Sequence, residues 1–340
     1  MRPLARLGYP ILTFAAIFLL GEGIARLLGY RPANPPPDPT APTAAAVAAW
    51  REHPLLGFAP TGGTSKYGTF SITKLANGRR ITHPLETYGD TTTRKKAMWI
   101  FGCSFTQGWR LNDDETYPWL LQKELPDWEV VNFGVSAYST LQSLIQLEDA
   151  LDRGEQRPEL AIMAYADFHE QRNTLTRIWR KSMARSLPHG RVKYPYARLG
   201  RNGQLEIFHE PFEYLELPLK HYSALLTALE TRYDDFVEFR YRSREVSEAI
   251  LNEMFTLCRA KGIKFAVAGI SRSSWTADVL RWCRERSIPV ADISVDLKIP
   301  GNSFLPQDGH PNAAANRQYA QKLQAFLCKE WIGALPCVQP

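Results

Sequence analysis

The feature that most constrains this chain is a series of short apolar runs, separated by helical patterns, that begins at residue 97. Runs that are apolar throughout suit strands buried on both faces. Their alternation with helices is typical of a parallel sheet covered by helices on both sides. The predicted strands are 97–102, 129–133, 160–165, 264–270 and 288–293; the predicted helices are about 114–125, 243–261, 274–286 and 313–330, with another ending at Leu151.

The first run stops at a glycine and is followed at once by Ser104. A polar patch, Asn112–Glu115, then caps the next helical pattern. A strand, a glycine turn, a serine and a helix place a hydroxyl at the carboxyl end of a parallel strand, where open α/β sheets bind their ligands. The alternative is that Ser104 only caps the turn.

The far end of the chain supplies a partner for such a hydroxyl. Within 306–312, Asp308 stands two residues before His310. A serine is a weak nucleophile unless a base takes its proton, and an imidazole oriented by a carboxylate can do so. Gly309 predicts a tight local turn that brings the carboxylate to the ring, and Pro311 or Asn312 starts the last helix. Half of a metal site is the alternative interpretation, but the nearby sequence offers no further ligand cluster.

Acyl transfer also needs donors aimed at a developing oxyanion. The backbone N–H of Ser104 is one candidate. Gly134, which ends the second strand, is another, because a glycine lets a substrate approach the backbone closely. A third donor is expected in 165–173, after the third strand.

Three blocks in this order resemble the SGNH (GDSL-like) hydrolase superfamily: Gly102–Gly108, Asn132–Ser136 and Asp308–Asn312. The resemblance covers about 97–330, and the N-terminal segment resembles that of membrane-anchored bacterial members. It implies a flavodoxin-like three-layer fold with no cofactor and no metal. The resemblance makes Ser104 the nucleophile, His310 the base and Asp308 its orienting acid, with Ser104 and Gly134 as backbone oxyanion donors.

The chain departs from the family pattern at two places. Cys103 stands where an acidic residue is usual, and the third block, Gly-x-Asn-Asp, is replaced by 166–173. The side-chain oxyanion donor is then His169 or Asn173, or this loop makes only structural contacts. The lipase-type Gly-x-Ser-x-Gly elbow is absent, because position 106 is Thr.

The N-terminus carries an apolar segment. Arg2 and Arg6 precede an uncharged stretch from Leu7 to Gly21, which is shorter than the ~20 residues that span a bilayer as a helix. A pair between Glu22 and Arg26 on one helical face extends it. We expect an uncleaved anchor with a cytoplasmic N-terminus and the rest exported. A signal peptide and a buried helix of a soluble protein are the alternatives.

The remaining segments set the expected domain organisation. A β-rich lead-in contains strands at 53–58 and 67–72 and a turn at 76–79. An insertion next to the hydrolase-like blocks contains a hairpin over 196–208 and a helix around 219–234. The expected parts are an anchor or signal segment (1–30), a Pro/Ala-rich linker (31–48), the lead-in (49–96), the hydrolase-like domain (97–330) with its insertion (174–242), and a tail (331–340).

Composition excludes little beyond this. The net charge is +6, and the basic clusters at 177–181 and 240–244 belong to no recognisable nucleic-acid module, so we expect no nucleic-acid partner. The five cysteines lack metal-ligand spacing. Cys103 is interpreted as a small buried residue, and Cys328 and Cys337 form a disulfide if the compartment is oxidising.

Together these features predict a membrane-tethered, periplasmic serine esterase of SGNH type. It would remove a short acyl group, such as O-acetyl, from a glycan or lipid through an acyl-serine intermediate. Two alternatives remain open at this point. One is an acyltransferase that moves the acyl group onto a polysaccharide hydroxyl, and the other is a binding protein that kept the fold without turnover.

Overall fold

The computed structural model describes residues 3–33, 50–88, 96–186, 192–211, 214 and 217–332. The chain divides into two compact units. One contains 1–43, 176–191 and 212–242; the other contains 44–175, 192–211 and 243–340. Each unit is described by itself.

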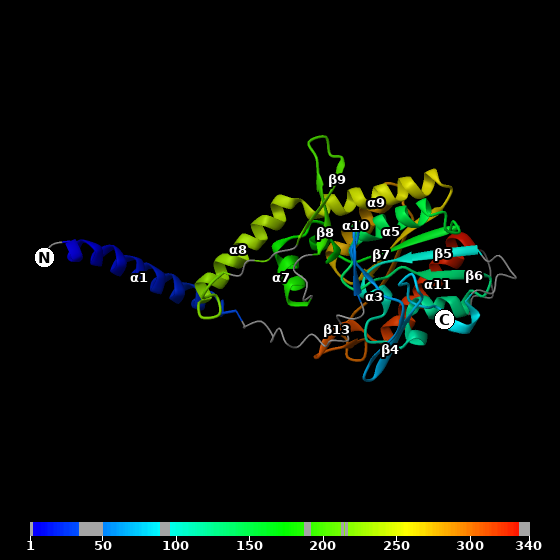
Figure 1. The fold of residues 1–340 in the computed structure, drawn as a ribbon, viewed down its shortest axis with the longest axis horizontal. Coiled ribbons are helices and arrows are strands. Elements are labelled where there is room, and N and C mark those ends of the chain that lie inside the picture. The colour runs from blue at the N-terminus through cyan, green and yellow to red at the C-terminus, as the bar shows by residue number, and fades with distance from the viewer. Residues whose placement is uncertain are drawn as a thin grey trace. The chain divides into compact units, whose positions relative to one another are not determined.

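The larger unit is built on a five-stranded parallel sheet (Figure 1). Its order is β11-β10-β7-β5-β6, which in chain order is the 2-1-3-4-5 arrangement of flavodoxin-like folds. The predicted fold class and all five predicted strands are therefore confirmed. The strands are β5 (Lys96–Phe101), β6 (Trp128–Asn132), β7 (Leu160–Tyr165), β10 (Lys264–Ser271) and β11 (Val290–Val295).

Helices cover the sheet (Figure 1). Helix α4 (Tyr117–Glu124) packs against α11 (Ala313–Leu327), and α5 (Thr140–Asp152) packs against α9 (Ser243–Ala260). Helix α10 (Ser274–Glu285) lies on β10 and β11. The core between the sheet and the first pair is mainly apolar, because strand residues that point to one face meet one side of each helix. It includes Met98, Ile100, Ile162, Ile293, Leu121 and Leu323.

The lead-in forms two hairpins rather than the two strands that the sequence predicts. They are β1 (Trp50–His53) with β2 (Gly57–Pro60), and β3 (Gly63–Tyr67) with β4 (Phe70–Lys74). The predictions of strands at 53–58 and 67–72 are wrong, because each crosses a turn. In the first turn the His53 ring accepts the N–H groups of Leu55 and Leu56, a side-chain contact that competes with strand hydrogen bonds.

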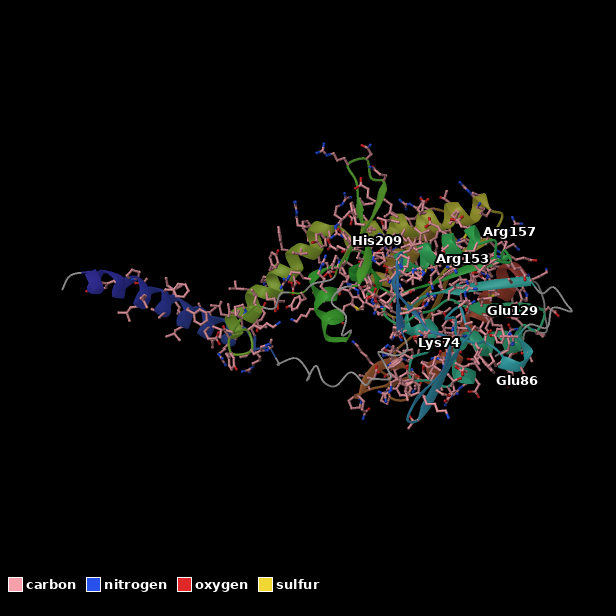
Figure 2. The ribbon with its side chains drawn as sticks, in the orientation of Figure 1. Lys74, Glu86, Glu129, Arg153, Arg157 and His209 are labelled. Carbon is pink, nitrogen blue, oxygen red and sulfur yellow. The ribbon has the colours of Figure 1, made fainter. Side chains whose placement is uncertain are left out.

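The lead-in is attached to β6 by polar contacts. Thr82 donates its hydroxyl to the carbonyl of Val130 at 2.7 Å. His83 Nε2 lies 3.1 Å from the carboxylate of Glu129, which Figure 2 labels on β6. The short helix η1 (Leu85–Thr87) follows. These contacts give the lead-in a fixed place beside the sheet edge.

The insertion contributes to both units. The predicted hairpin is confirmed as β8 (Lys193–Leu199) with β9 (Leu205–Pro211), in the larger unit. The smaller unit holds α7 (Arg177–Ser186) and α8 (Ala224–Tyr241). Helix α8 starts later than predicted, because Ser223 caps it by accepting the N–H of Leu226, and it runs on to a left-handed Arg242.

The smaller unit also contains α1 (Pro3–Leu27), which packs against α8. Within the described residues one helix, over Tyr9–Leu27, is long and apolar enough to cross a membrane, with a mean hydropathy of 1.6. The predicted pair of Glu22 and Arg26 forms, at 2.7 Å.

The C-terminal helix ends earlier than predicted, and a π-helical segment, η3 (Cys328–Ile332), follows α11. Cys103, Cys258 and Cys283 are free and buried. Cys328 is disulfide-bonded. Cys337 lies outside the described residues, so the pairing of Cys328 with Cys337 stays a prediction.

Candidate functional site

The turn after β5 is shaped by one glycine. The short helix α3 (Ser104–Gln107) begins two residues after Gly102. At Gly102 φ is +159°, and an added Cβ would lie 2.2 Å from Thr106 Oγ1. A side chain there would collide with α3, so glycine is what allows the helix to fold back over the strand end. Ser104 therefore opens α3 at the carboxyl end of a central strand, as the sequence predicts.

The second piece of the site is a short strand near the C-terminus. β13 (Asp308–Pro311) pairs with β12 (Ser303–Phe304). The tight turn predicted at Gly309 is not formed. Instead, Asp308 and His310 are two residues apart on an extended strand, which points both side chains to the same face. Asn312 caps α11 by accepting the N–H groups of the following turn, as predicted.

The structure brings the serine, the histidine and the aspartate together. His310 Nε2 lies 2.9 Å from Ser104 Oγ. His310 Nδ1 lies 2.5 Å from Asp308 Oδ1, and this oxygen also accepts the backbone N–H of His310 at 2.9 Å. An imidazole placed in this way can take the hydroxyl proton while the carboxylate fixes its tautomer and stabilises the imidazolium.

The Asp308 carboxylate is held in its charged form. Burial acts to raise its pKa, but hydrogen bonds and charge from His310 and the charge of Arg110 outweigh it and lower the pKa to about 2. Arg110 Nη1 lies 3.6 Å from the second oxygen of Asp308. The Phe105 ring and the imidazole form a T-shaped pair, with ring centroids 5.6 Å apart. The histidine is thus held by a carboxylate on one side and an aromatic ring on another.

Gly134 lies against the turn that carries the serine. An added Cβ would lie 2.5 Å from the backbone nitrogen of Gln107. The Gly134 N–H donates to Asn132 Oδ1 at 2.9 Å, and the amide of Asn132 donates to the carbonyl of Thr106 at 3.0 Å. The glycine is required for close packing, and its N–H is already hydrogen-bonded. Its role as an oxyanion donor stays a prediction.

The two side-chain candidates from the third loop are buried inside the protein, and His169 Nε2 has no hydrogen-bond partner among the described residues. Both lie in α6 (His169–Asn173) and are fully buried. Burial lowers the pKa of His169, which stays neutral, and its Nδ1 lies 3.3 Å from Thr140 Oγ1. The Asn173 amide accepts from the N–H of Leu141 and donates to Ser247. Their role as oxyanion donors also stays a prediction.

Arg172, which stands between these two candidates, was not predicted from the sequence. Its guanidinium donates to the carbonyl of Tyr138 at 2.8 Å and lies 4.5 Å from the Phe168 ring centroid. It also lies close to Cys103, the neighbour of Ser104. Arg172 therefore connects the loops that follow β5, β6 and β7. The sequence signal that could have identified it is that Arg172 is the one lysine or arginine within 166–173.

Arg80 was missed as well. Its side chain is fully buried and donates to the carbonyls of Gln107, Gly108 and Leu111 at 2.6–2.7 Å. It also pairs with Asp113 at 2.9 Å. One guanidinium from the lead-in thus holds the loop that follows Ser104. No local signal marks this residue, because all these contacts are distant in sequence.

Among the described residues, no group of three or more His, Cys, Asp or Glu side chains is placed to hold a metal ion. What the fold and the site define is a parallel α/β protein with a serine, a histidine and an aspartate in hydrogen-bond contact at the carboxyl edge of its sheet.

No family model matches this sequence, and no curated protein matches it. Solved structures do. An acetylxylan esterase, Axe2, from Geobacillus stearothermophilus is 12% identical with a TM-score of 0.42, over 71% of this chain and 97% of that one. A member of the lipolytic protein G-D-S-L family from Veillonella parvula is 10% identical with a TM-score of 0.39, over 69% and 98%.

A third match is the psychrotrophic esterase EstA from Pseudoalteromonas sp., at 11% identity and a TM-score of 0.39, over 69% of this chain and 98% of that one. At such identities and TM-scores these matches carry no argument about the activity of this chain.

Proposed function

We propose that this chain is a serine ester hydrolase of SGNH type. Ser104 is the nucleophile, His310 takes its proton, and Asp308 orients the imidazole. The observation that carries the proposal is the position of His310 Nε2, 2.9 Å from Ser104 Oγ, while Nδ1 contacts Asp308 at 2.5 Å. A base within hydrogen-bond reach of a hydroxyl, oriented by a third group, is the arrangement that activates serine.

In the proposed reaction the Ser104 oxygen attacks the ester carbonyl and its proton passes to His310. The tetrahedral intermediate collapses, His310 returns the proton to the leaving alcohol, and water then releases the acid from the acyl-serine. The first-turn N–H of Ser104 has no partner inside α3, so it is available to the oxyanion. Gly134 is the second donor, sharing its N–H with Asn132.

For the substrate we propose a short acyl ester, such as O-acetyl, on a glycan or lipid. We also propose that α1 is an uncleaved membrane anchor with the rest of the chain in the periplasm. The apolar helix over Tyr9–Leu27 and the preceding arginines support the anchor. A reporter fused after Pro340 should then be active only outside the cytoplasm, and activity inside would refute this orientation.

The enzymatic proposal is tested with the purified full chain and a fluorophosphonate probe followed by peptide mapping. Labelling at Ser104 supports the proposal, and absence of labelling in folded protein overturns it in favour of a binding protein. Product analysis of an acetylated glycan, with and without an acceptor glycan, then distinguishes release of free acetate from transfer to a sugar hydroxyl.

A further inference from the structure

Helix α8 carries a line of large apolar side chains on its surface. Leu229, Tyr233 and Phe236 are 55%, 54% and 57% exposed. Their spacing of four and three residues puts them on one face of the helix. We call these three residues the α8 stripe. Phe239, farther along, is 81% exposed. Side chains of this size leave water when a matching surface is present.

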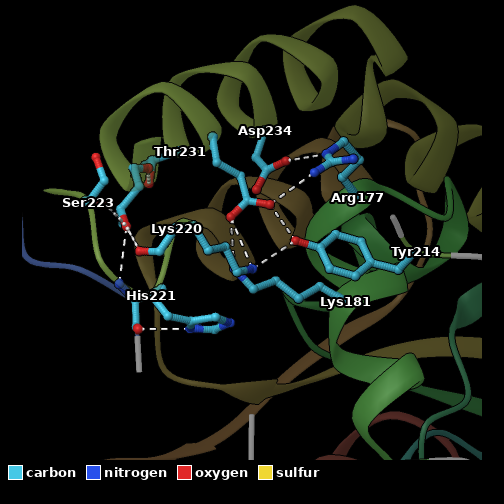
Figure 3. Close-up of polar contacts among 11 residues, drawn as sticks. Arg177, Lys181, Tyr214, Lys220, His221, Ser223, Thr231 and Asp234 are labelled. Atoms are coloured by element: carbon cyan, nitrogen blue, oxygen red, sulfur yellow. Dashed lines mark hydrogen bonds and ion pairs between the residues drawn. The ribbon is translucent and has the colours of Figure 1, made fainter. Parts of the chain in front are cut away.

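Another face of α8 is fixed by charged side chains, whose contacts Figure 3 shows. Glu230 is 3% exposed and pairs with Arg177, Lys181 and Lys220 at 3.0–3.4 Å. Asp234 pairs with Arg177 at 2.8 Å. A buried carboxylate stays only where its partners are, so these pairs set the rotation of the helix. That rotation directs the α8 stripe outward.

The start of α8 is tied to the apolar helix α1. The carboxylate of Glu22 accepts from the Ser223 hydroxyl and from the N–H groups of Ala224 and Leu225, at 2.7–3.0 Å. Glu22 therefore caps α8 together with Ser223. Next to it, Gly21 leaves room for Leu225: an added Cβ would lie 2.9 Å from a Leu225 methyl carbon.

This cap places the first turn of α8 beside the last turns of the apolar stretch Tyr9–Leu27. Glu22 lies inside the stretch Tyr9–Leu27, five residues before its end. At 1.5 Å per residue that is about 7.5 Å along the helix axis. A carboxylate at this depth in a membrane needs partners, and the start of α8 supplies them.

We propose that the α8 stripe rests on the lipid surface, with its side chains inserted at the boundary between headgroups and acyl chains. The occupant is the phospholipid bilayer that α1 enters, so this inference rests on the proposed anchor. Arg232 and Arg240 are exposed and lie beside the stripe, three residues after Leu229 and four after Phe236. Their guanidinium groups reach lipid phosphates while their methylene stems stay on the apolar side, as in interfacial helices.

The test uses the full chain reconstituted in vesicles of phosphatidylcholine and phosphatidylglycerol. A nitroxide is attached at Phe236→Cys, and its collisions with oxygen, which enters lipid, and with a nickel chelate, which stays in water, are compared by power saturation. The cysteines at 103, 258 and 283 are buried and do not compete for the label.

The matched control is Thr231→Cys, an exposed position five residues earlier on the same helix and on another face. A label at Phe14→Cys in α1 reports whether the anchor is inserted. We expect an oxygen-to-nickel accessibility ratio several-fold higher at position 236 than at position 231, approaching that at position 14. Leu229→Cys should repeat the result at position 236.

Equal ratios at positions 236 and 231, with a lipid-type ratio at position 14, would overturn the inference and leave the anchor standing. A water-type ratio at position 14 would refute the anchor, and the inference with it. Dipolar broadening between labels at position 236 at low protein density would identify a second copy as the occupant and also overturn the inference. Hydrolysis of 4-nitrophenyl acetate in the same vesicles tests the Ser104 site separately.

Discussion

Two clusters of polar side chains in this molecule each hold a charged carboxylate, but they differ in what they can do. In the first, His310 stands between Ser104 and Asp308. In the second, Glu230 is surrounded by Arg177, Lys181, Lys220 and the Tyr214 hydroxyl, which donates to it. Both contain a carboxylate that is held ionised. The pKa of Glu230 is lowered, because the Tyr214 hydroxyl and the neighbouring cations outweigh the effect of burial.

The difference lies in what the partners can exchange. Burial raises the pKa of Tyr214 to about 12. The other partners of Glu230 are two lysines and an arginine, so every partner of Glu230 keeps its proton at neutral pH. In the first cluster an imidazole joins a hydroxyl to a carboxylate, and a proton can move between them. The Glu230 cluster therefore fits a structural role, whereas the cluster of Ser104, His310 and Asp308 has the proton path that catalysis needs.

The sharpest test of this comparison removes the hydroxyl. We expect Ser104→Ala to lower kcat for 4-nitrophenyl acetate by at least about a thousandfold, because the nucleophile is lost while the oxyanion donors and binding contacts remain. Its melting temperature should stay close to that of the unchanged chain. The matched control is Ser65→Ala on the lead-in hairpin, which should keep full activity. Equal loss in both variants would contradict the assignment.

The second test breaks the other cluster. Glu230→Gln removes the charge that pairs with three cations: Arg177 keeps its pair with Asp234, but the fully buried Lys220 loses its pair with Glu230. We expect a loss of about 3 kcal/mol in the free energy of unfolding, measured by urea denaturation. Ester hydrolysis per folded molecule should be unchanged. Glu206→Gln, an exposed carboxylate on β9, is the control and should change stability little. A large drop in kcat with normal stability would show that the two clusters are not distinct in role.

The first cluster could be predicted from the sequence and the second could not, for a physical reason. Ser104 follows a strand end and His310 precedes a helix start, and parallel sheets bring such positions to one edge. The strand pattern therefore located Ser104, and the spacing of Asp308 and His310 ahead of the last helix located its partner. The contacts of Glu230 join α8 to α7 and to the segment around Lys220, and no periodic sequence pattern predicts them. Arg80 was missed for the same reason, since its acceptors are backbone carbonyls that any residue could present.

Boundaries were predicted less well than elements. The lead-in strands at 53–58 and 67–72 were wrong because His53 and Gly68 form turns that apolar periodicity does not register. Helix α8 was shifted because Ser223, not an earlier residue, provides the cap. In both cases a local side-chain or backbone preference decided where an element of the right type began.

The third test follows the charge of Asp308 with pH. Its pKa falls from a usual value of 3.8 to about 2 in the folded protein. Its contribution to stability is therefore fully present above pH 3.8 and is lost as the pH falls through 2. The difference corresponds to about 2 kcal/mol. In urea denaturation, Asp308→Asn should be less stable than the unchanged chain at pH 5, and the two should converge near pH 2. A gap that stays constant with pH would contradict the coupling to His310.

The smallest expected effect concerns Arg172, which lies beside the first cluster and contacts the loops around it. Arg172→Lys keeps the charge but loses the planar fork that contacts Cys103, the Tyr138 carbonyl and the Phe168 ring. The loops carrying Ser104 and Gly134 would then be held less tightly. We expect kcat to fall about tenfold, or about 1.4 kcal/mol, with KM nearly constant.

A merely structural role would instead lower the amount of folded protein and leave kcat per folded molecule intact. The control is Arg157→Lys, an exposed arginine before β7 that Figure 2 labels and that lies at the amino end of that strand. It should match the unchanged chain in both kcat and stability. If Arg172→Lys also equals the unchanged chain in kcat and stability, the loops keep their geometry without the guanidinium fork. The contact between Ser104 and His310 then depends only on the sheet edge and β13.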